Sequence, residues 1–124
     1  MAHILVVDDS ATDQYVFKQV LEKNGHQVTV AKEGKEGVSL ARQLKPDLIL
    51  MDVVMPVLNG FQATRELARS DSTRQIPIIM ITSKDAESDV QWAKRQGASA
   101  YIVKPVKEGR LIECIGRLLE TPPI

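Results

Sequence analysis

Hydrophobic residues along the chain follow two alternating patterns. Short apolar runs bounded by polar residues occur near 3–7, 27–31, 48–51, 77–82 and 100–103, and such runs are typical of buried parallel strands. Between these runs, apolar residues recur at the spacing of helical turns. Strands that alternate with helices predict an α/β domain, in which helices cover both faces of a parallel sheet.

Each predicted helix has apolar residues that can face the sheet. The first helix begins after Ser10, a possible N-cap, the second spans about 35–45, and the third follows Asn59-Gly60. The fifth lies near 107–120. The expected inward residues are Val16, Phe17, Val20 and Leu21 in the first helix, Val38, Ala41 and Leu44 in the second, Phe61, Thr64, Leu67 and Ala68 in the third, and Leu111, Ile115, Leu118 and Leu119 in the fifth.

The fourth helix, 86–96, has a thinner apolar face. Only Val90 and Ala93 form a convincing inward pair, and Trp92 lies beside them. Right-handed crossovers, together with acidic residues on the first and third strands, favour the strand order 2-1-3-4-5. The predicted fold is therefore a flavodoxin-like three-layer sandwich with a five-stranded parallel sheet.

Carboxylates follow two of the predicted strands. Asp8 and Asp9 come directly after the first, and Asp52 comes after the third. The carboxyl ends of parallel strands meet at one edge of the sheet, where open α/β folds bind ligands. Neighbouring carboxylates there would repel by about 3 to 4 kcal/mol per pair at an effective dielectric of about 20. A divalent cation or a raised pKa must relieve this repulsion.

Two more strand ends bring a hydroxyl and an ammonium group to the same edge. The fourth strand ends at Thr82, and the fifth runs from Tyr101 into Lys104-Pro105. Phosphoryl transfer needs an oxygen nucleophile, a cation and fixed donors, and Mg²⁺ prefers such an oxygen-rich environment. The strand ends therefore predict a metal and phosphoryl site.

Composition limits the remaining function classes. Sixteen basic and sixteen acidic residues give a formal net charge of zero, which lacks the electrostatic footprint of a nucleic-acid binder. The apolar stretches are too short to span a bilayer, and a single cysteine allows no internal disulfide. We expect a cytoplasmic protein without membrane insertion, formed by one domain over 1–124 with no output domain. Its output would then come through a partner.

Four motifs resemble the signatures of the response regulator receiver domain family. They are VVDDS at 6–10, MDVVMPVLNG at 51–60, ITS at 81–83 and YIVKP at 101–105. Within this family, the segments at 60–65 and 84–98 resemble a CheY-like regulator of type IV pilus twitching motility.

The resemblance implies a role for each strand-end residue. Asp52 would be the phosphoacceptor, and Lys104 would pair with a phosphoryl oxygen. Asp9 and Asp52, with the backbone carbonyl of Val54, would ligate Mg²⁺ (or Mn²⁺). Asp8 would act mainly through a metal-coordinated water and Lys104.

The resemblance also implies a conformational switch. Thr82 would move to hydrogen-bond a phosphoryl oxygen, and Tyr101 would rotate inward behind it. This movement would change the face formed by the fourth helix, the fifth strand and the fifth helix. The peptide bond between Lys104 and Pro105 is expected to be cis.

Partners and kinetics follow from the same resemblance. A CheA-like histidine kinase, or its phosphotransfer domain, would donate the phosphoryl group, and a downstream pilus or motility protein would bind the switched face. Val54 and Lys84 would influence the lifetime of the acyl phosphate. The protein would be a signalling protein that catalyses only its own phosphorylation and dephosphorylation.

Two alternative functions remain. The chain could be a receiver module that binds proteins without phosphorylation. It could also be an aspartyl phosphatase of the haloacid dehalogenase type, although that class expects an Asp-x-Asp pair after the first strand, whereas Asp8 and Asp9 are adjacent. A flavodoxin is excluded, because the loop at 8–13 is acidic where a flavin phosphate would bind.

Several residues have structural explanations that compete with functional ones. Tyr101 could be an ordinary half-buried strand aromatic, and Trp92 could pack in the fold or contact a partner. His3 and His26 lack metal-ligand spacing, and Cys114 is expected to be a small core residue. We assign no chemistry to these last three residues.

Overall fold

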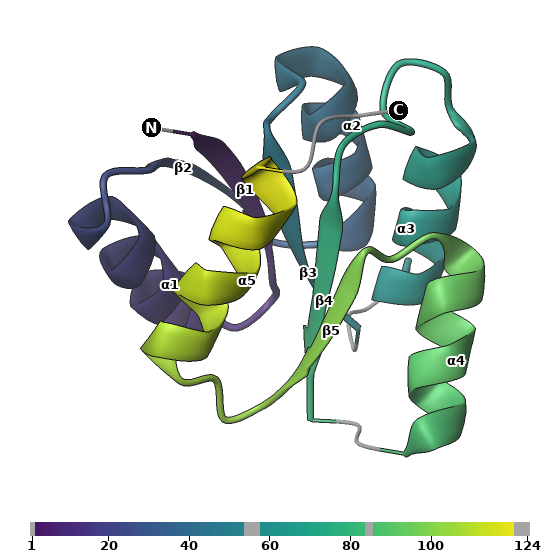
Figure 1. Ribbon diagram of the computed structural model, residues 1–124. Coiled ribbons are helices and arrows are strands. Elements are labelled where there is room, and N and C mark those ends of the chain that lie inside the picture. The colour runs from purple at the N-terminus through teal and green to yellow at the C-terminus, as the bar shows by residue number, and fades with distance from the viewer. Residues whose placement is uncertain (1, 54–57, 84–85, 121–124) are drawn as a thin grey trace.

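Five strands alternate with five helices in a computed structural model that describes residues 2–53, 58–83 and 86–120 (Figure 1). No helix within these ranges is both long and apolar enough to cross a membrane. In chain order the elements are β1 (His3–Val7), α1 (Ala11–Lys23), β2 (Gln27–Ala31), α2 (Gly34–Leu44), β3 (Leu48–Asp52), α3 (Gly60–Arg69), β4 (Ile78–Thr82), α4 (Glu87–Gln96), β5 (Ala100–Val103) and α5 (Glu108–Glu120).

The strands form one parallel sheet in the order β2-β1-β3-β4-β5, which confirms the predicted topology. The register decides which strand ends are neighbours. Val7 of β1 is paired with Met51 of β3, so Asp8 and Asp52 each follow a paired residue at the same level of the sheet. The strand order changes direction between β1 and β3. In open α/β folds, ligands bind at the carboxyl ends of the strands at such a switch point.

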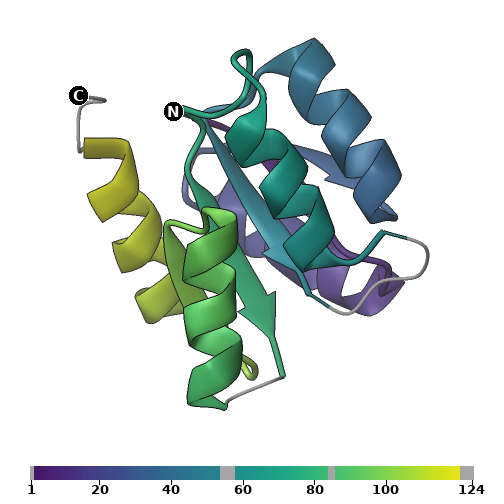
Figure 2. The same ribbon diagram turned by 90° about the vertical axis from the view of Figure 1, so that its right-hand side faces the viewer.

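Helices cover both faces of the sheet. Figure 1 shows α1 and α5 on one face, and Figure 2 brings α2, α3 and α4 on the other face toward the viewer. The core under α1 and α5 includes Phe17, Leu21, Leu111 and Ile115. The core under α2 and α3 includes Val38, Ala41, Ala63 and Leu67. Burial of these apolar side chains on both faces fixes the sheet between two helical layers.

Two of the predicted inward residues are exposed. Val16 of α1 is 49% exposed, because Phe17 and Leu21, four residues apart, form the side that faces the sheet and Val16 is rotated away from it. Leu44 is 41% exposed at the last position of α2, where the left-handed backbone of Lys45 ends the helix. The apolar faces predicted for α1 and α2 were therefore too wide by one residue each.

The fourth helix has the thin apolar face that its sequence predicts. Ala93 is its buried residue, Val90 is half-buried, and Trp92 is 48% exposed. The small cluster beneath α4 also includes Met80 of β4, and Tyr101 of β5 packs against it. The helix α4 is thus anchored by fewer buried side chains than its neighbours.

Candidate functional site at the carboxyl edge of the sheet

Three carboxylates meet where β1 and β3 end. One carboxylate oxygen from each of Asp8, Asp9 and Asp52 lies within 4.8 Å of the others. Asp8 and Asp52 are only 2% and 7% exposed, whereas Asp9 is exposed. The predicted acidic cluster therefore forms, with two of its members buried in the floor of the site.

Lys104 brings the ammonium group to this cluster from the end of β5. Its Nζ lies 3.6 Å from Asp8 Oδ2 and 3.9 Å from Asp52 Oδ1. The backbone N–H of Lys104 donates to the Thr82 carbonyl at 2.7 Å, which continues the pairing of β4 with β5. The peptide bond between Lys104 and Pro105 is cis, as the family resemblance implies. The two ion-pair distances show that the lysine side chain reaches across the edge of the sheet toward β1 and β3.

A fourth carboxylate, which the sequence did not predict, makes the shortest contact with the Lys104 ammonium group. Asp13 Oδ2 in the first turn of α1 accepts a hydrogen bond from Lys104 Nζ at 2.8 Å. An acidic residue in the first turn of a helix ordinarily stabilises the helix dipole, so its sequence position alone does not mark it as part of a site. The sequence feature that could have indicated Asp13 is that α1 begins at the same edge of the sheet as the acidic cluster.

Burial and neighbouring charges shift the pKa values of Asp8 and Lys104. Burial raises the pKa of Asp8, and nearby Asp13 and Asp9 add to this, although the Ser10 N–H and Lys104 oppose it. Burial alone would lower the pKa of Lys104, but the hydrogen bond to Asp13 and the surrounding carboxylates raise it overall. The ammonium group therefore stays charged at neutral pH.

The donor set fits a hard divalent ion. Among the described residues, the three clustered carboxylates of Asp8, Asp9 and Asp52 outnumber the one ammonium group that contacts Asp8 and Asp52, and that group also pairs with Asp13. Oxygen ligands with excess negative charge are what Mg²⁺ prefers in proteins. Two positions named for this site, Val54 and Lys84, lie outside the described residues.

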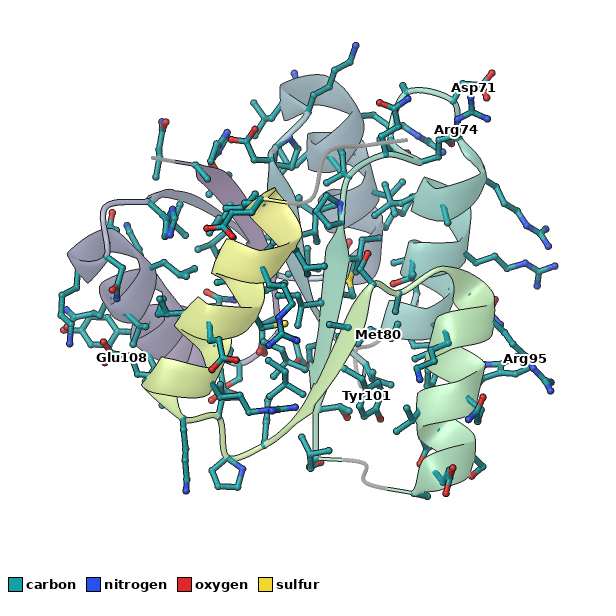
Figure 3. All side chains as sticks on the ribbon, viewed as in Figure 1. Asp71, Arg74, Met80, Arg95, Tyr101 and Glu108 are labelled. Carbon is teal, nitrogen blue, oxygen red and sulfur yellow. The ribbon has the colours of Figure 1, made fainter. Side chains whose placement is uncertain are left out.

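The two predicted switch residues lie on neighbouring strands beside the acidic cluster. Thr82 is fully buried at the end of β4. Tyr101 of β5 is half-buried and pairs in register with Met80, and Figure 3 shows its ring on the side of the sheet that carries α4. Tyr101 packs against the small cluster of Val53, Met80 and Ala93, so it lies between the site and α4.

The histidines and the cysteine take structural places outside the site. His3 Nε2 lies 2.7 Å from Thr29 Oγ1, and His26 Nδ1 accepts a hydrogen bond from the Ala2 N–H at 3.3 Å. Cys114 is half-buried against the core under α5, and burial raises the pKa of its thiol.

Comparison with known proteins identifies the family. A family model described as the response regulator receiver domain matches residues 4–116, so the chain belongs to that family. Receiver domains are signalling proteins of two-component systems, in which they interact with histidine kinases and downstream targets. Among individual proteins, the chain is similar to Protein PilH of Pseudomonas aeruginosa, with 56% identity over 119 residues that cover 96% of this chain and 98% of that protein.

Solved structures show the same fold. The chemotaxis protein CheY4 of Vibrio cholerae superposes with a TM-score of 0.90 at 30% identity, covering 95% of this chain and 98% of that one. The receiver domain of a sensor histidine kinase from Pseudomonas aeruginosa has a TM-score of 0.90 at 32% identity, covering 97% of this chain and 98% of that one. The latter structure contains a magnesium ion coordinated in its active-site cleft.

Proposed function

We propose that this receiver accepts a phosphoryl group on Asp52 and thereby changes its affinity for a partner protein. The observation that carries the proposal is the placement of the Asp52 carboxylate, buried within the acidic cluster and 3.9 Å from the Lys104 ammonium group. A carboxylate nucleophile, a cation beside it and further anionic oxygens for a metal are the parts that phosphoryl transfer needs.

The phosphoryl donor would be a phosphohistidine of a CheA-like histidine kinase or its phosphotransfer domain. An oxygen of the Asp52 carboxylate attacks phosphorus, and the P–N bond breaks with its electron pair passing to the imidazole, which takes a proton from solvent. The product is an acyl phosphate on Asp52. Water later attacks phosphorus, releasing inorganic phosphate and restoring the carboxylate. During these steps the Lys104 ammonium group would pair with a phosphoryl oxygen.

A divalent metal ion fits the proposed chemistry. Asp9 and Asp52 would hold Mg²⁺ (or Mn²⁺) together with the backbone carbonyl of Val54, and Asp8 would act on the ion mainly through a coordinated water. When bound, the ion neutralises the negative charge of the phosphoryl oxygens. The acidic excess at the site and the magnesium ion in the histidine kinase receiver domain support this assignment.

Phosphorylation would be read on the face formed by α4, β5 and α5. Thr82 would hydrogen-bond a phosphoryl oxygen, and Tyr101 would follow it inward from its half-buried place beside Met80. The elements that form this face carry large exposed apolar side chains, Trp92 of α4 at 48% and Val103 of β5 at 38%. Because few buried residues anchor α4, a small movement of Tyr101 can change the shape of this surface.

The downstream role that we propose is in type IV pilus twitching motility or related chemotaxis-like signalling. The support is the 56% identity to PilH, which extends over nearly the whole of both chains. The direct target would be a pilus or motility protein that binds the switched face. A nucleic-acid target is disfavoured by the zero net charge.

The phosphorylation-independent module is the alternative that an experiment must separate. Such a module would bind its partner through the fold and the face formed by α4, β5 and α5. Its function would not require buried carboxylates at the ends of β1 and β3. The phosphatase alternative has less support, because Asp8 and Asp9 are adjacent where an Asp-x-Asp pair is expected.

The proposal is tested by intact-mass measurement after brief incubation with acetyl phosphate, with and without Mg²⁺. Wild type is expected to gain one phosphoryl group only when Mg²⁺ is present. The variant Asp52→Asn should gain none, a loss of at least about 100-fold in adduct, because the amide is a poor nucleophile. Circular dichroism of both proteins should be alike, since the substitution keeps the shape of the side chain.

The control for a short-lived adduct is beryllofluoride, a stable mimic of the phosphoryl group. Binding of beryllofluoride by wild type but not by Asp52→Asn would still support the proposal. An adduct of equal size on Asp52→Asn would contradict the assignment of the site. If wild type takes neither the phosphoryl group nor beryllofluoride, the phosphorylation-independent module becomes the better explanation.

A further inference from the structure

The shortest polar contact of the Lys104 ammonium group is with Asp13 and not with the predicted phosphoacceptor. Lys104 Nζ lies 2.8 Å from Asp13 Oδ2, compared with 3.6 Å to Asp8 Oδ2 and 3.9 Å to Asp52 Oδ1. Only the first of these distances is within ordinary hydrogen-bond range. The ammonium group is therefore drawn toward α1 and away from Asp52.

The position of Asp13 is fixed by the way α1 begins. Ser10 is the N-cap, and its Oγ accepts a hydrogen bond from the Asp13 N–H at 3.3 Å. The Ser10 N–H in turn donates to Asp8 Oδ1 at 2.9 Å. The loop from β1 to α1 thus ties Asp13 to the acidic cluster through two consecutive hydrogen bonds, so its carboxylate approaches Lys104 from a defined direction.

We propose that Asp13 is a positioning residue that holds the Lys104 ammonium group in the unphosphorylated protein and competes with the phosphoryl group on Asp52 for it. The inference rests on the proposed function of Asp52. It adds a residue of α1 to the site, and it predicts that Asp13 adjusts how readily the phosphorylated state forms.

The competition follows from the geometry of one ammonium group between two anions. A phosphoryl group on Asp52 presents new anionic oxygens on the side of Lys104 that faces the acceptor, and a charge-assisted hydrogen bond to them requires the ammonium group to move away from Asp13 or to share its donors. The Lys104 and Asp13 side chains are 25% and 37% exposed. Ion pairs with this much solvent contact are weak. Asp13 therefore slows phosphorylation of Asp52 by a small factor and does not prevent it.

The test compares initial rates of adduct formation on Asp52 with limiting acetyl phosphate in the presence of Mg²⁺. In this reaction an Asp52 oxygen bonds to phosphorus and acetate leaves with the electron pair of the broken P–O bond. Asp13→Asn removes the competing charge and should raise the rate by about two- to fivefold, the range expected for a partly exposed ion pair. Asp13→Glu keeps the charge and should remain closer to wild type.

A matched control separates this effect from the general loss of one negative charge. Glu36 is an exposed acidic residue in the first turn of α2, and its Oε1 accepts a hydrogen bond from the Lys32 N–H that a glutamine can also accept. Glu36→Gln therefore makes the same change of charge at a helix start without touching Lys104. Its rate should equal that of wild type.

Two further measurements show whether Asp13 acts through Lys104. In a Lys104→Met background, the effect of Asp13→Asn should disappear, because the double-mutant cycle removes the shared partner. The NMR signal of the Lys104 side chain should also shift in Asp13→Asn before any donor is added. This second measurement does not depend on phosphorylation.

The outcomes distinguish this inference from the proposed function. If wild type is phosphorylated but Asp13→Asn is no faster than Glu36→Gln, or is slower than wild type, the competition is wrong and the role of Asp52 stands. An effect that persists in the Lys104→Met background, or an unshifted Lys104 signal, would also overturn it. If wild type takes no phosphoryl group or mimic, the proposed function fails and the competition fails with it.

Discussion

The two edges of the sheet use polar side chains in opposite ways. At the amino edge, where the strands begin, polar groups close the backbone or lie in water: Asp47 Oδ2 accepts a hydrogen bond from the His3 N–H at 2.7 Å. Asp71 and Arg74, at the top of Figure 3, form an exposed ion pair of 3.7 Å with side chains that are 96% and 60% exposed. Such contacts need little desolvation.

At the carboxyl edge, carboxylates are buried against one another. Asp8 and Asp52 are almost without solvent contact, and within the described part of the chain the Lys104 ammonium group lies 3.6 Å from Asp8 and 3.9 Å from Asp52. Burial of like charges disfavours the folded state, so stability does not explain why these residues are there. The buried acidic cluster thus suits the carboxyl edge to a cation, whereas the polar groups described at the amino edge complete the sheet or lie in solvent.

Among substitutions at the two edges, Gly60→Ala at the carboxyl edge is expected to change the free energy of unfolding most. A Cβ at Gly60 would overlap the Asp52 carbonyl oxygen and lie 2.8 Å from the Val53 Cα, and backbone atoms cannot move away easily. We expect a loss of about 3 kcal/mol in the free energy of unfolding, with reduced phosphorylation in the protein that still folds. Urea denaturation measures the first and intact mass the second.

Gly25→Ala is the matched control at the amino edge. A Cβ at Gly25 would meet nothing within 4 Å, so only its positive φ of 88° opposes alanine. The expected cost is about 1 kcal/mol, without change in phosphorylation. Equal losses in the two variants would show that the carboxyl edge is no more tightly packed around β3 than the amino edge is around its turns.

Most of the fold could be predicted because its signals are local. Runs such as Ile78–Thr82, in which every residue is buried, appear in the sequence as unbroken apolar segments, and the strand ends mark the site directly. The errors at Val16 and Leu44 have a different origin. Both are apolar residues beside a real stripe, and only the docking angle and length of the helix decide that they face water.

The ion pair of Lys104 with Asp13 could not be predicted in the same way. These residues are 91 positions apart in the chain, and which of several carboxylates lies nearest to the ammonium group depends on side-chain geometry at the level of about one ångström. The sequence predicts which charges reach the edge, and the structure decides how they pair.

The next largest effect is expected from Asp8→Asn, which should stabilise the metal-free protein by about 1 kcal/mol at neutral pH. The amide can still accept the Ser10 N–H, and it removes a buried charge that faces Asp9 and Asp52. Urea denaturation without metal measures the gain. Mg²⁺ should reduce this gain, because the wild-type carboxylate then has a cation to bind.

The pH dependence of the same variant follows from the raised pKa of Asp8. Burial raises the pKa of Asp8 in the folded protein above the ordinary value of 3.8. Protonation of Asp8 therefore stabilises the folded wild type, fully below pH 3.8, and this stabilisation is lost as pH rises through the folded-state pKa. The advantage of Asp8→Asn should therefore grow as pH rises from about 4 toward neutrality. An advantage that shrinks over this range would mean that Lys104 outweighs burial at Asp8.

The smallest effect, and one of opposite sign, is expected from Asp47→Asn at the amino edge. The carboxylate makes a charge-assisted hydrogen bond to the start of β1, and the Asp47 N–H donates back to the His3 carbonyl at 2.8 Å. An amide keeps the hydrogen bond but weakens it, so we expect a loss of about 0.5 kcal/mol in the free energy of unfolding, independent of Mg²⁺. The same chemical change would then stabilise one edge of the sheet and destabilise the other. If Asp47→Asn were instead stabilising, removal of an acid would favour folding at both edges, and the stabilisation of Asp8→Asn would no longer distinguish a ligand site from the rest of the surface.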